Sequence, residues 1–299
     1  MAKNFLERLQ NDILVAYAPM QTLLIDWGKD MESHLSEWIL AHPDKYQDAL
    51  GQSYRAGCDM GHTATQASSK FRSIPFGLES KVFEFNYQSA KLAKEVTPPD
   101  NFVVGNISAS NPDFLEPYGN MTYDYVYEGY KEQILGLAEG GVDAFHISGN
   151  HIDELNVAIK VAKDHTDIPV IGSNVFYKGK KGFRTMMGQD PRTASEMVDK
   201  AGADLVCLNC GLVDYRGTTE VLRLMREGTT KYLGVMPDAG LPELIDGVTV
   251  YPLTPEEMAR EGLNWMEAGA RLVGGCCGTT LKHYEAISEA VKQWRARRL

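Results

Sequence analysis

The amino-acid sequence predicts a (β/α)8 barrel, an α/β fold, and two observations support that prediction. Short apolar runs alternate with longer stretches of helical periodicity, and eight such units follow one another at spacings of roughly thirty residues. No glycine-rich nucleotide loop opens any helical stretch, which disfavours the runner-up, a doubly wound open sheet. We find neither a domain linker nor a low-complexity segment, so we expect residues 1–299 to form one domain.

The first four strand–helix units are expected before residue 166. The apolar runs that predict strands are residues 13–20, 57–62, 102–108 and 142–148. Helical spacing predicts a short N-terminal helix and further helices over 31–56, 78–95, 124–138 and 153–165. Pro43 interrupts the helix over 31–56, and Gly140 with Gly141 is a usual stop signal after the helix over 124–138.

The last four units repeat the pattern more clearly. Their strands are expected at residues 169–176, 204–210, 232–236 and 272–275. Their helices are expected at residues 191–201, 218–226, 255–268 and 281–295.

Composition limits the classes of function. The formal net charge is −10 and the pI is about 5.2, which argues against a surface for nucleic acid or for anionic membranes. No apolar run approaches membrane-spanning length, and the N-terminal residues lack the apolar core of a signal peptide. We therefore expect a cytoplasmic protein; its oligomeric state stays open.

Chemistry in such a barrel gathers at the C-terminal ends of the strands. For His62 and His146, a hydrogen-bonded structural role is the alternative to substrate contact. For Asn106 and Asn174, the alternative is that each amide satisfies loop backbone groups. The polar residues expected at these ends are Tyr17, His62, Asn106, His146, Ser148, Asn174, Asn209, Cys210, Asp238, Cys276 and Cys277.

The five cysteines divide into two groups. Cys58 and Cys207 lie within or beside apolar runs and are expected to be small core residues. Cys210, Cys276 and Cys277 end two expected strands, and three thiolates with one open position make a reactive zinc site. An odd number of cysteines, two of them adjacent, is a poor disulfide framework. Cys276 and Cys277 can share one metal only if the chain bends, which the flanking glycines permit.

These motifs resemble the homocysteine S-methyltransferase family. The resemblance is carried by residues 209–211 (Asn-Cys-Gly) and 274–279 (Gly-Gly-Cys-Cys-Gly-Thr), and it continues through 237–242 and 254–258 and more weakly back to Met20 and Thr22. The family includes the homocysteine domain of cobalamin-dependent methionine synthase and betaine–homocysteine methyltransferase. The resemblance implies a (β/α)8 barrel, a zinc ion on three cysteines and a methyltransferase that uses them.

The sequence departs from the family at two strand ends. The first-strand motif of the family is usually Asp-Gly-Ala-Met-Gly-Thr, whereas Tyr17 stands at the aspartate position here, with Met20 kept. The fourth strand of the family usually ends in Glu-Thr, whereas this chain has Ser148 and Gly149. In the family, those two acids hold the amino group of homocysteine. A buried ammonium without a carboxylate is costly, so we expect a less charged or aromatic substrate beside Tyr17, His62, His146 and Phe176.

The second methyl carrier must lie outside this chain if the reaction uses a corrinoid. The sequence has no glycine-rich loop for S-adenosylmethionine and no Asp-x-His-x-x-Gly cobalamin motif. We therefore expect transfer between a small methylated compound and a separate corrinoid protein. The basic segment 177–184 is a docking or substrate-phosphate contact in this interpretation, or else a solvated loop. The alternatives are an ordinary homocysteine S-methyltransferase and a protein that stores zinc or senses redox state without turnover.

Overall fold

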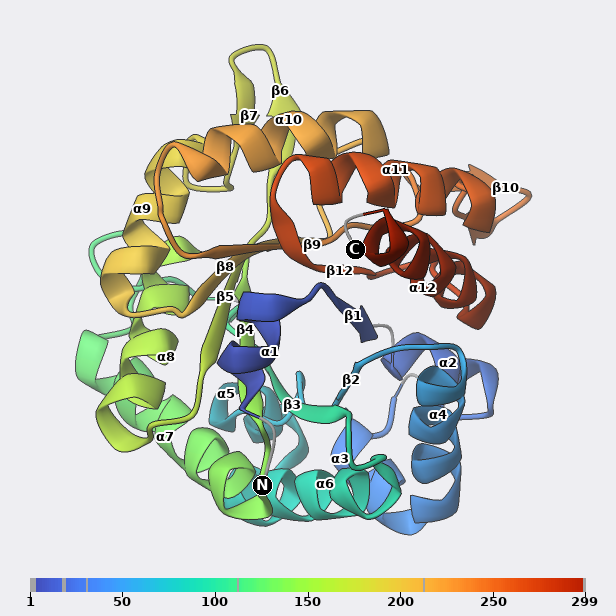
Figure 1. The fold of residues 1–299 in the computed structure, drawn as a ribbon. Helices are drawn as coiled ribbons and strands as arrows, with labels where there is room; N and C mark the ends of the chain where they lie inside the picture. The colour runs from blue at the N-terminus through green and yellow to red at the C-terminus, as the bar shows by residue number, and fades with distance from the viewer. Residues whose placement is uncertain (1–3, 18–19, 31, 112, 212, 298–299) are drawn as a thin grey trace.

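Within the residues that the structure describes, eight parallel strands close into a barrel surrounded by helices (Figure 1). This computed structural model describes residues 4–297 except 18–19, 31, 112 and 212, and it leaves out the side chains of 21, 22, 26 and 248. Around the barrel the order is β1, β12, β9, β8, β5, β4, β3 and β2. The strands are β1 (Leu14–Tyr17), β2 (Met60–His62), β3 (Phe102–Ser108), β4 (Ala144–Gly149), β5 (Val170–Asn174), β8 (Leu205–Asn209), β9 (Tyr232–Met236) and β12 (Ala270–Gly275).

Helices follow the strands and form the outer layer. None in the described ranges combines the length and apolarity that a membrane span needs. The α-helices are α1 (Phe5–Asn11), α2 (Met20–Asp26), α3 (Leu35–Ala41), α4 (Pro43–Arg55), α5 (Lys70–Ser73), α6 (Val82–Val96), α7 (Tyr123–Gly140), α8 (Ile152–His165), α9 (Pro191–Ala201), α10 (Tyr215–Arg226), α11 (Pro255–Glu267) and α12 (Leu281–Ala296). Two 3₁₀ turns, η1 (Ile74–Phe76) and η2 (Glu79–Lys81), precede α6.

Local sequence signals set where these helices begin and end. The side chains of Thr122, Asp190 and Asp214 accept backbone N–H groups in the first turns of α7, α9 and α10. Thr254 and Glu257 form a reciprocal capping box at the start of α11. Helix α7 ends at Gly141 with a left-handed φ of 89°, which glycine adopts without a Cβ penalty.

The interior of the barrel is apolar at the end where the strands begin. In barrels of this kind, residues of one layer come from alternate strands, and the strand register identifies each layer. One such layer is Met60, Ala144, Leu205 and Leu272. Phe5 and Leu9 of α1 pack on the same cluster, so α1 closes this end of the barrel, as the helix lying across the near end in Figure 1 shows.

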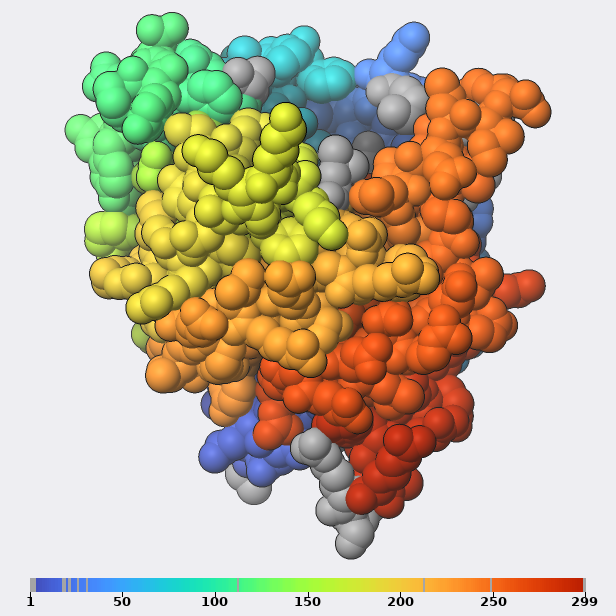
Figure 2. All heavy atoms as spheres, turned by 90° about the horizontal axis from the view of Figure 1, so that it is seen from above, coloured from blue at the N-terminus to red at the C-terminus, as the bar shows by residue number. Residues whose placement is uncertain are grey.

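The opposite end carries the loops that follow the strands. Two antiparallel hairpins rise from it: β6 (Tyr177–Gly179) with β7 (Gly182–Arg184), and β10 (Glu243–Ile245) with β11 (Val248–Val250). Figure 2 shows the orange segment projecting at the end of the molecule away from α1, and Figure 1 shows β6 and β7 extending outward beyond α10.

The predicted barrel is confirmed, with two corrections to its elements. Met20 opens helix α2 instead of ending the first strand, because that strand stops at Tyr17. Segment 177–184 is a β-hairpin and not an irregular loop, since Gly182 supplies the left-handed φ of 84° that its turn needs. The hairpin 243–250 was not predicted either, and its Asp246 and Gly247 likewise have positive φ.

The packing of α7 against α6 predicts opposite effects for one substitution at two helical glycines. A Cβ at Gly136 would lie 2.6 Å from the Phe83 carbonyl oxygen of α6, whereas a Cβ at Gly262 in α11 would meet nothing within 4 Å. Gly136→Ala gains up to about 1 kcal/mol of helix propensity but overpacks a backbone contact, so we expect net destabilisation of about 1–2 kcal/mol. Gly262→Ala should stabilise by up to about 1 kcal/mol.

Urea unfolding followed by circular dichroism measures both changes. A Gly136→Ala variant as stable as the unmodified protein would show that α6 and α7 do not pack this closely.

Candidate metal centre

The structure brings four potential metal ligands together at the barrel mouth. Cys210 follows β8, Asp238 follows β9, and Cys276 and Cys277 follow β12, so three adjacent strands supply them. Their sulfur atoms and one carboxylate oxygen all lie within 4.8 Å of one another. Two ligands of a tetrahedral zinc with sulfur at 2.3 Å are separated by roughly 4 Å, so the spacing fits a single ion.

Cys210 reaches the cluster through an unusual backbone conformation. Its φ is +49°, a left-handed value that non-glycine residues rarely adopt, and Gly211 follows with φ +90°. The Cys210 N–H donates to the carbonyl oxygen of Met236 at 3.1 Å, which keeps the turn against β9. Such a conformation costs on the order of 1–3 kcal/mol, a cost commonly found at functional sites.

Hydrogen bonds to the segment after β9 hold the two adjacent cysteines. The N–H of Cys276 donates to the Pro237 carbonyl oxygen at 2.8 Å, and the N–H of Cys277 donates to Asp238 Oδ1 at 3.0 Å. The N–H of Ala239 returns a bond to the Cys277 carbonyl oxygen at 2.9 Å. Asp238 therefore positions the cysteine pair and also lies among the groups that could bind a metal ion.

The bend expected at the two cysteines depends on Gly278. Its φ is +76°, and a Cβ there would lie 2.1 Å from the ring of Tyr251, so only glycine fits. Helix α12 supports the turn from behind: the Tyr284 hydroxyl donates to the Gly275 carbonyl oxygen at 2.8 Å. Thr279 Oγ1 donates to the Cys276 carbonyl oxygen at 2.6 Å. Sequence reasoning did not single out Tyr251 or Tyr284, because nothing in their spacing marks these contacts, and it included Thr279 only as the last residue of the cysteine motif.

Two of the expected ligands are joined in a disulfide. Cys210 and Cys276 form it, with Cα atoms 5.8 Å apart, and Cys277 is free. The sequence was interpreted as a poor disulfide framework, and this pair is an exception to that interpretation. The physical reason is that sulfur atoms held closely enough to share one metal ion are also close enough to bond to each other. Metal binding by all three cysteines needs the reduced state.

In the absence of a cation, burial disfavours the negatively charged forms of Asp238 and Cys277. It raises the pKa of Asp238 to about 6, against the effect of the Cys277 N–H bond. Burial and the nearby Asp238 carboxyl raise the pKa of the Cys277 thiol to about 11. A bound divalent cation reverses this balance and favours the thiolate and carboxylate forms. Three soft sulfur donors and one oxygen donor are a ligand set that suits zinc.

The register of the strands places several predicted residues inside the barrel, beneath the sulfur cluster at its mouth. Ser148 and Asn209 share an interior layer with Cys276. His62 and His146 share a deeper layer with Cys207, and Asn106 lies between these layers with Ser173. Ser173 was missed by sequence reasoning, although its alternation with Ile171 could have placed it inside.

Three of the predicted residues lie apart from this interior set. Tyr17 alternates outward, and its ring packs on Tyr284 of α12 with centroids 4.9 Å apart. Asn174 alternates with Val170 and Gly172 along β5, so its side chain faces outward from the barrel. It is nevertheless buried, with 1% exposure. Met20 is buried at the start of α2. A role for each in substrate binding stays a prediction.

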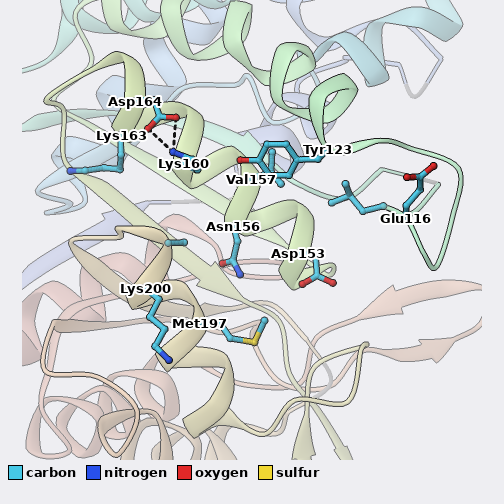
Figure 3. A pocket seen from close by; sticks show the side chains of 12 residues that line it. Glu116, Tyr123, Asp153, Asn156, Val157, Lys160, Lys163, Asp164, Met197 and Lys200 are labelled. Atoms are coloured by element: carbon cyan, nitrogen blue, oxygen red, sulfur yellow. Dashed lines mark hydrogen bonds and ion pairs between the residues drawn. The ribbon is translucent and has the colours of Figure 1, made fainter.

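A separate groove of about 850 Å³ lies on the flank of the barrel, away from the sulfur cluster. Asn156 and Lys160 of α8 and Met197 and Lys200 of α9 are among the residues that line it (Figure 3). None of the residues lining it is a strand end, so it is not part of the candidate centre.

Comparisons with known proteins show which proteins this chain is similar to. The family model described as homocysteine S-methyltransferase matches residues 9–291. The methionine synthase of Mycobacterium leprae (strain TN) is 26% identical over 307 residues, which cover 96% of this chain and 25% of that protein. This chain thus spans about a quarter of the length of that relative.

Solved structures show the same fold. The metallated form of the homocysteine methyltransferase MmuM from Escherichia coli has a TM-score of 0.78 at 18% identity, covering 96% of this chain and 99% of that one. The oxidized form of the same protein has a TM-score of 0.75 at 20% identity, covering 96% and 98%.

The geometry predicts one zinc ion per chain in the reduced protein. Replacing Cys276 and Cys277 together by alanine should abolish zinc binding and leave the barrel folded, because the ligands lie beyond the strand ends. Cys58→Ala is the matched control, since Cys58 is a buried cysteine outside the cluster. Metal content is measured by mass spectrometry after reduction and zinc loading. Full zinc retention in the double variant would rule out this ligand set.

Proposed function

The chain belongs to the homocysteine S-methyltransferase family and is a methyltransferase, and from that premise we propose that it moves a methyl group between a small S-, O- or N-methyl compound and a separate corrinoid protein. The proposed metal is zinc, held by Cys210, Cys276 and Cys277. The observation that carries this proposal is the convergence of three sulfur atoms at the mouth of a family barrel. The family resemblance found in the cysteine motifs is confirmed by the family match.

Zinc held by three thiolates supplies a mild Lewis acid, which stabilises the anionic form of a substrate sulfur, oxygen or nitrogen atom. The chain's own residues supply position. The backbone bonds from Cys276 to Pro237 and from Cys277 to Asp238 fix the ligands on β12 relative to β9. Ligands fixed in this way would hold a bound metal ion, and the substrate atom on it, in one position during the transfer.

The proposed substrate is not homocysteine, because the interior layer of Cys276 contains no carboxylate. Ser148 and Asn209 occupy the layer of Cys276, and neither can neutralise an ammonium group. Burying an ammonium group without a carboxylate partner costs several kcal/mol, about as much as breaking a buried ion pair. A substrate without that charge avoids the cost.

The second reactant is proposed to arrive on a separate corrinoid protein. The matched methionine synthase is about four times as long as the matched region, so in that relative this module is joined to further sequence. Here the basic hairpin 177–184 and the hairpin 243–250 border the mouth and offer a docking surface. Lys180 and Lys181 are exposed at the tip of the first hairpin.

Homocysteine S-methyltransferase activity is the alternative, and one observation favours it. Asp238 is a carboxylate beside the sulfur cluster, and it uses one oxygen for the Cys277 N–H. Its remaining lone pairs are sufficient for an ammonium group.

A zinc-storing or redox-sensing protein is the third reading, and the Cys210–Cys276 disulfide is the observation that favours it. Methyl transfer to cob(I)alamin or to a thiol separates both enzymes from this reading, since a storage protein catalyses neither.

Homocysteine should bind weakly to the unmodified zinc protein, and Ser148→Glu should strengthen its binding. A carboxylate in the layer of Cys276 pairs with the ammonium group, and a charged hydrogen bond of about 1.5–3 kcal/mol corresponds to roughly tenfold to a hundredfold in Kd. Ser148→Gln is the matched control, because it has the same size without the charge. Isothermal titration calorimetry measures each Kd. A low-micromolar Kd in the unmodified protein would favour the homocysteine alternative.

Charge reversal at Lys180 and Lys181 should slow methyl transfer to the corrinoid protein by about tenfold at low salt, since opposite charges steer docking. Zinc content should not change. Lys292→Glu with Arg297→Glu, two exposed cations at the far end of α12, is the control. Stopped-flow spectroscopy of the corrinoid follows the transfer. Equal rates in both double variants would exclude the hairpin as the docking site, and inertness toward every corrinoid would exclude the partner.

A further inference from the structure

Two histidines face each other inside the barrel, below the sulfur cluster. His62 ends β2 and His146 lies within β4, and the register puts both in one interior layer. Their ring centroids are 4.9 Å apart in a T-shaped arrangement, and the side chains are 0% and 2% exposed. The layers below contain apolar or small residues, so this pair is the floor of the polar part of the barrel.

The hydrogen bonding of His62 fixes its tautomer. Its Nδ1 lies within hydrogen-bonding distance of the Tyr17 carbonyl oxygen, which can only accept, so Nδ1 carries the proton. Burial lowers the pKa of His62 to about 4, so the ring is neutral at pH 7. Its Nε2 is therefore an acceptor with a free lone pair, and it has no hydrogen-bond partner in the described part of the chain.

Further unpaired polar atoms lead from this pair toward the cluster. His146 Nε2 is 2.7 Å from Ser173 Oγ, while His146 Nδ1 has no partner among the described residues. In the layer of Cys276, the buried Asn209 Oδ1 also lacks one within the same ranges. Each buried group left unsatisfied costs about 1–3 kcal/mol, so protein interiors usually pair such groups with ordered water or with a ligand.

We propose that His62, with His146 beside it, forms a neutral subsite that receives an uncharged hydrogen-bond donor, a hydroxyl or amide N–H, at the end of the substrate remote from the methyl group. The inference rests on the proposed function, because the other end of that substrate lies at the sulfur cluster. The fixed Nε2 acceptor selects a donor over an alkyl group of the same size. The surrounding layer, His62, His146, Cys207 and Gly274, has no carboxylate to compensate an ammonium.

Three matched series of thiols test this subsite in the reduced protein loaded with cobalt(II). The probes are ω-hydroxyalkanethiols with three to five carbons, the alkanethiols in which a methyl group replaces the hydroxyl, and the corresponding aminoalkanethiols. Visible absorption of the cobalt reports thiol binding and gives each Kd without any turnover. At the best chain length, we expect the hydroxyl probe to bind about fivefold to tenfold more tightly than either counterpart, as for one hydrogen bond.

Two variants of His62 identify the atom responsible. His62→Asn keeps a donor near Nδ1 for the Tyr17 carbonyl and removes the acceptor at Nε2, so the hydroxyl preference should disappear. His62→Gln places an amide oxygen near the Nε2 position and should restore most of the preference. A histidine with a purely structural role would not lose the hydroxyl preference in the asparagine variant and regain it in the glutamine variant.

The outcomes separate the two proposals. Thiols that bind cobalt with no dependence on the distal group, or a preference that survives in His62→Asn, would overturn the subsite and leave the proposed function intact. Failure of every thiol to change the cobalt spectrum would overturn the proposed metal chemistry, and the subsite with it.

Discussion

The close approach of β8, β9 and β12 is the constraint on which the mouth of this barrel depends. Gly234 on β9 has no room for a side chain, since a Cβ there would lie 2.9 Å from Cys207 Sγ of β8 and 3.2 Å from the Cβ of Leu272 on β12. Small residues therefore let the strand ends converge, and the bonds from Cys276 and Cys277 to the segment after β9 hold them there. The sulfur cluster is a consequence of this packing.

The same convergence gives the cysteines two uses that exclude each other. Cys210 and Cys276 can bond to each other, as they do in the structure, or they can share a cation with Cys277. The left-handed backbone at Cys210 accompanies the placement of its sulfur atom beside those of Cys276 and Cys277, at a cost on the order of 1–3 kcal/mol. Reducing conditions thus determine whether the centre is available to a metal, and the half-buried, protonated Cys277 thiol needs a cation to become a ligand.

The sequence predicted the barrel well because apolar periodicity is a local signal, and β3, α9 and β9 match the expected spans closely. It also predicted that Cys210, Cys276 and Cys277 meet, since glycines and a family motif mark them. It did not predict which way a residue near a strand end faces. Tyr17 and Asn174 alternate outward while Ser173 faces inward, and that phase depends on where each strand starts in the register. Contacts from distant segments, such as Tyr251 on Gly278, leave no local signal.

The central claim is that three sulfur atoms from two strand ends bind one zinc ion. Zinc K-edge X-ray absorption of the reduced, zinc-loaded protein tests it directly, because the spectrum counts sulfur neighbours and gives their distance. The account predicts three sulfur atoms at about 2.3 Å and one lighter oxygen or nitrogen neighbour. A spectrum with at most one sulfur atom, or with oxygen and nitrogen neighbours alone, would contradict it.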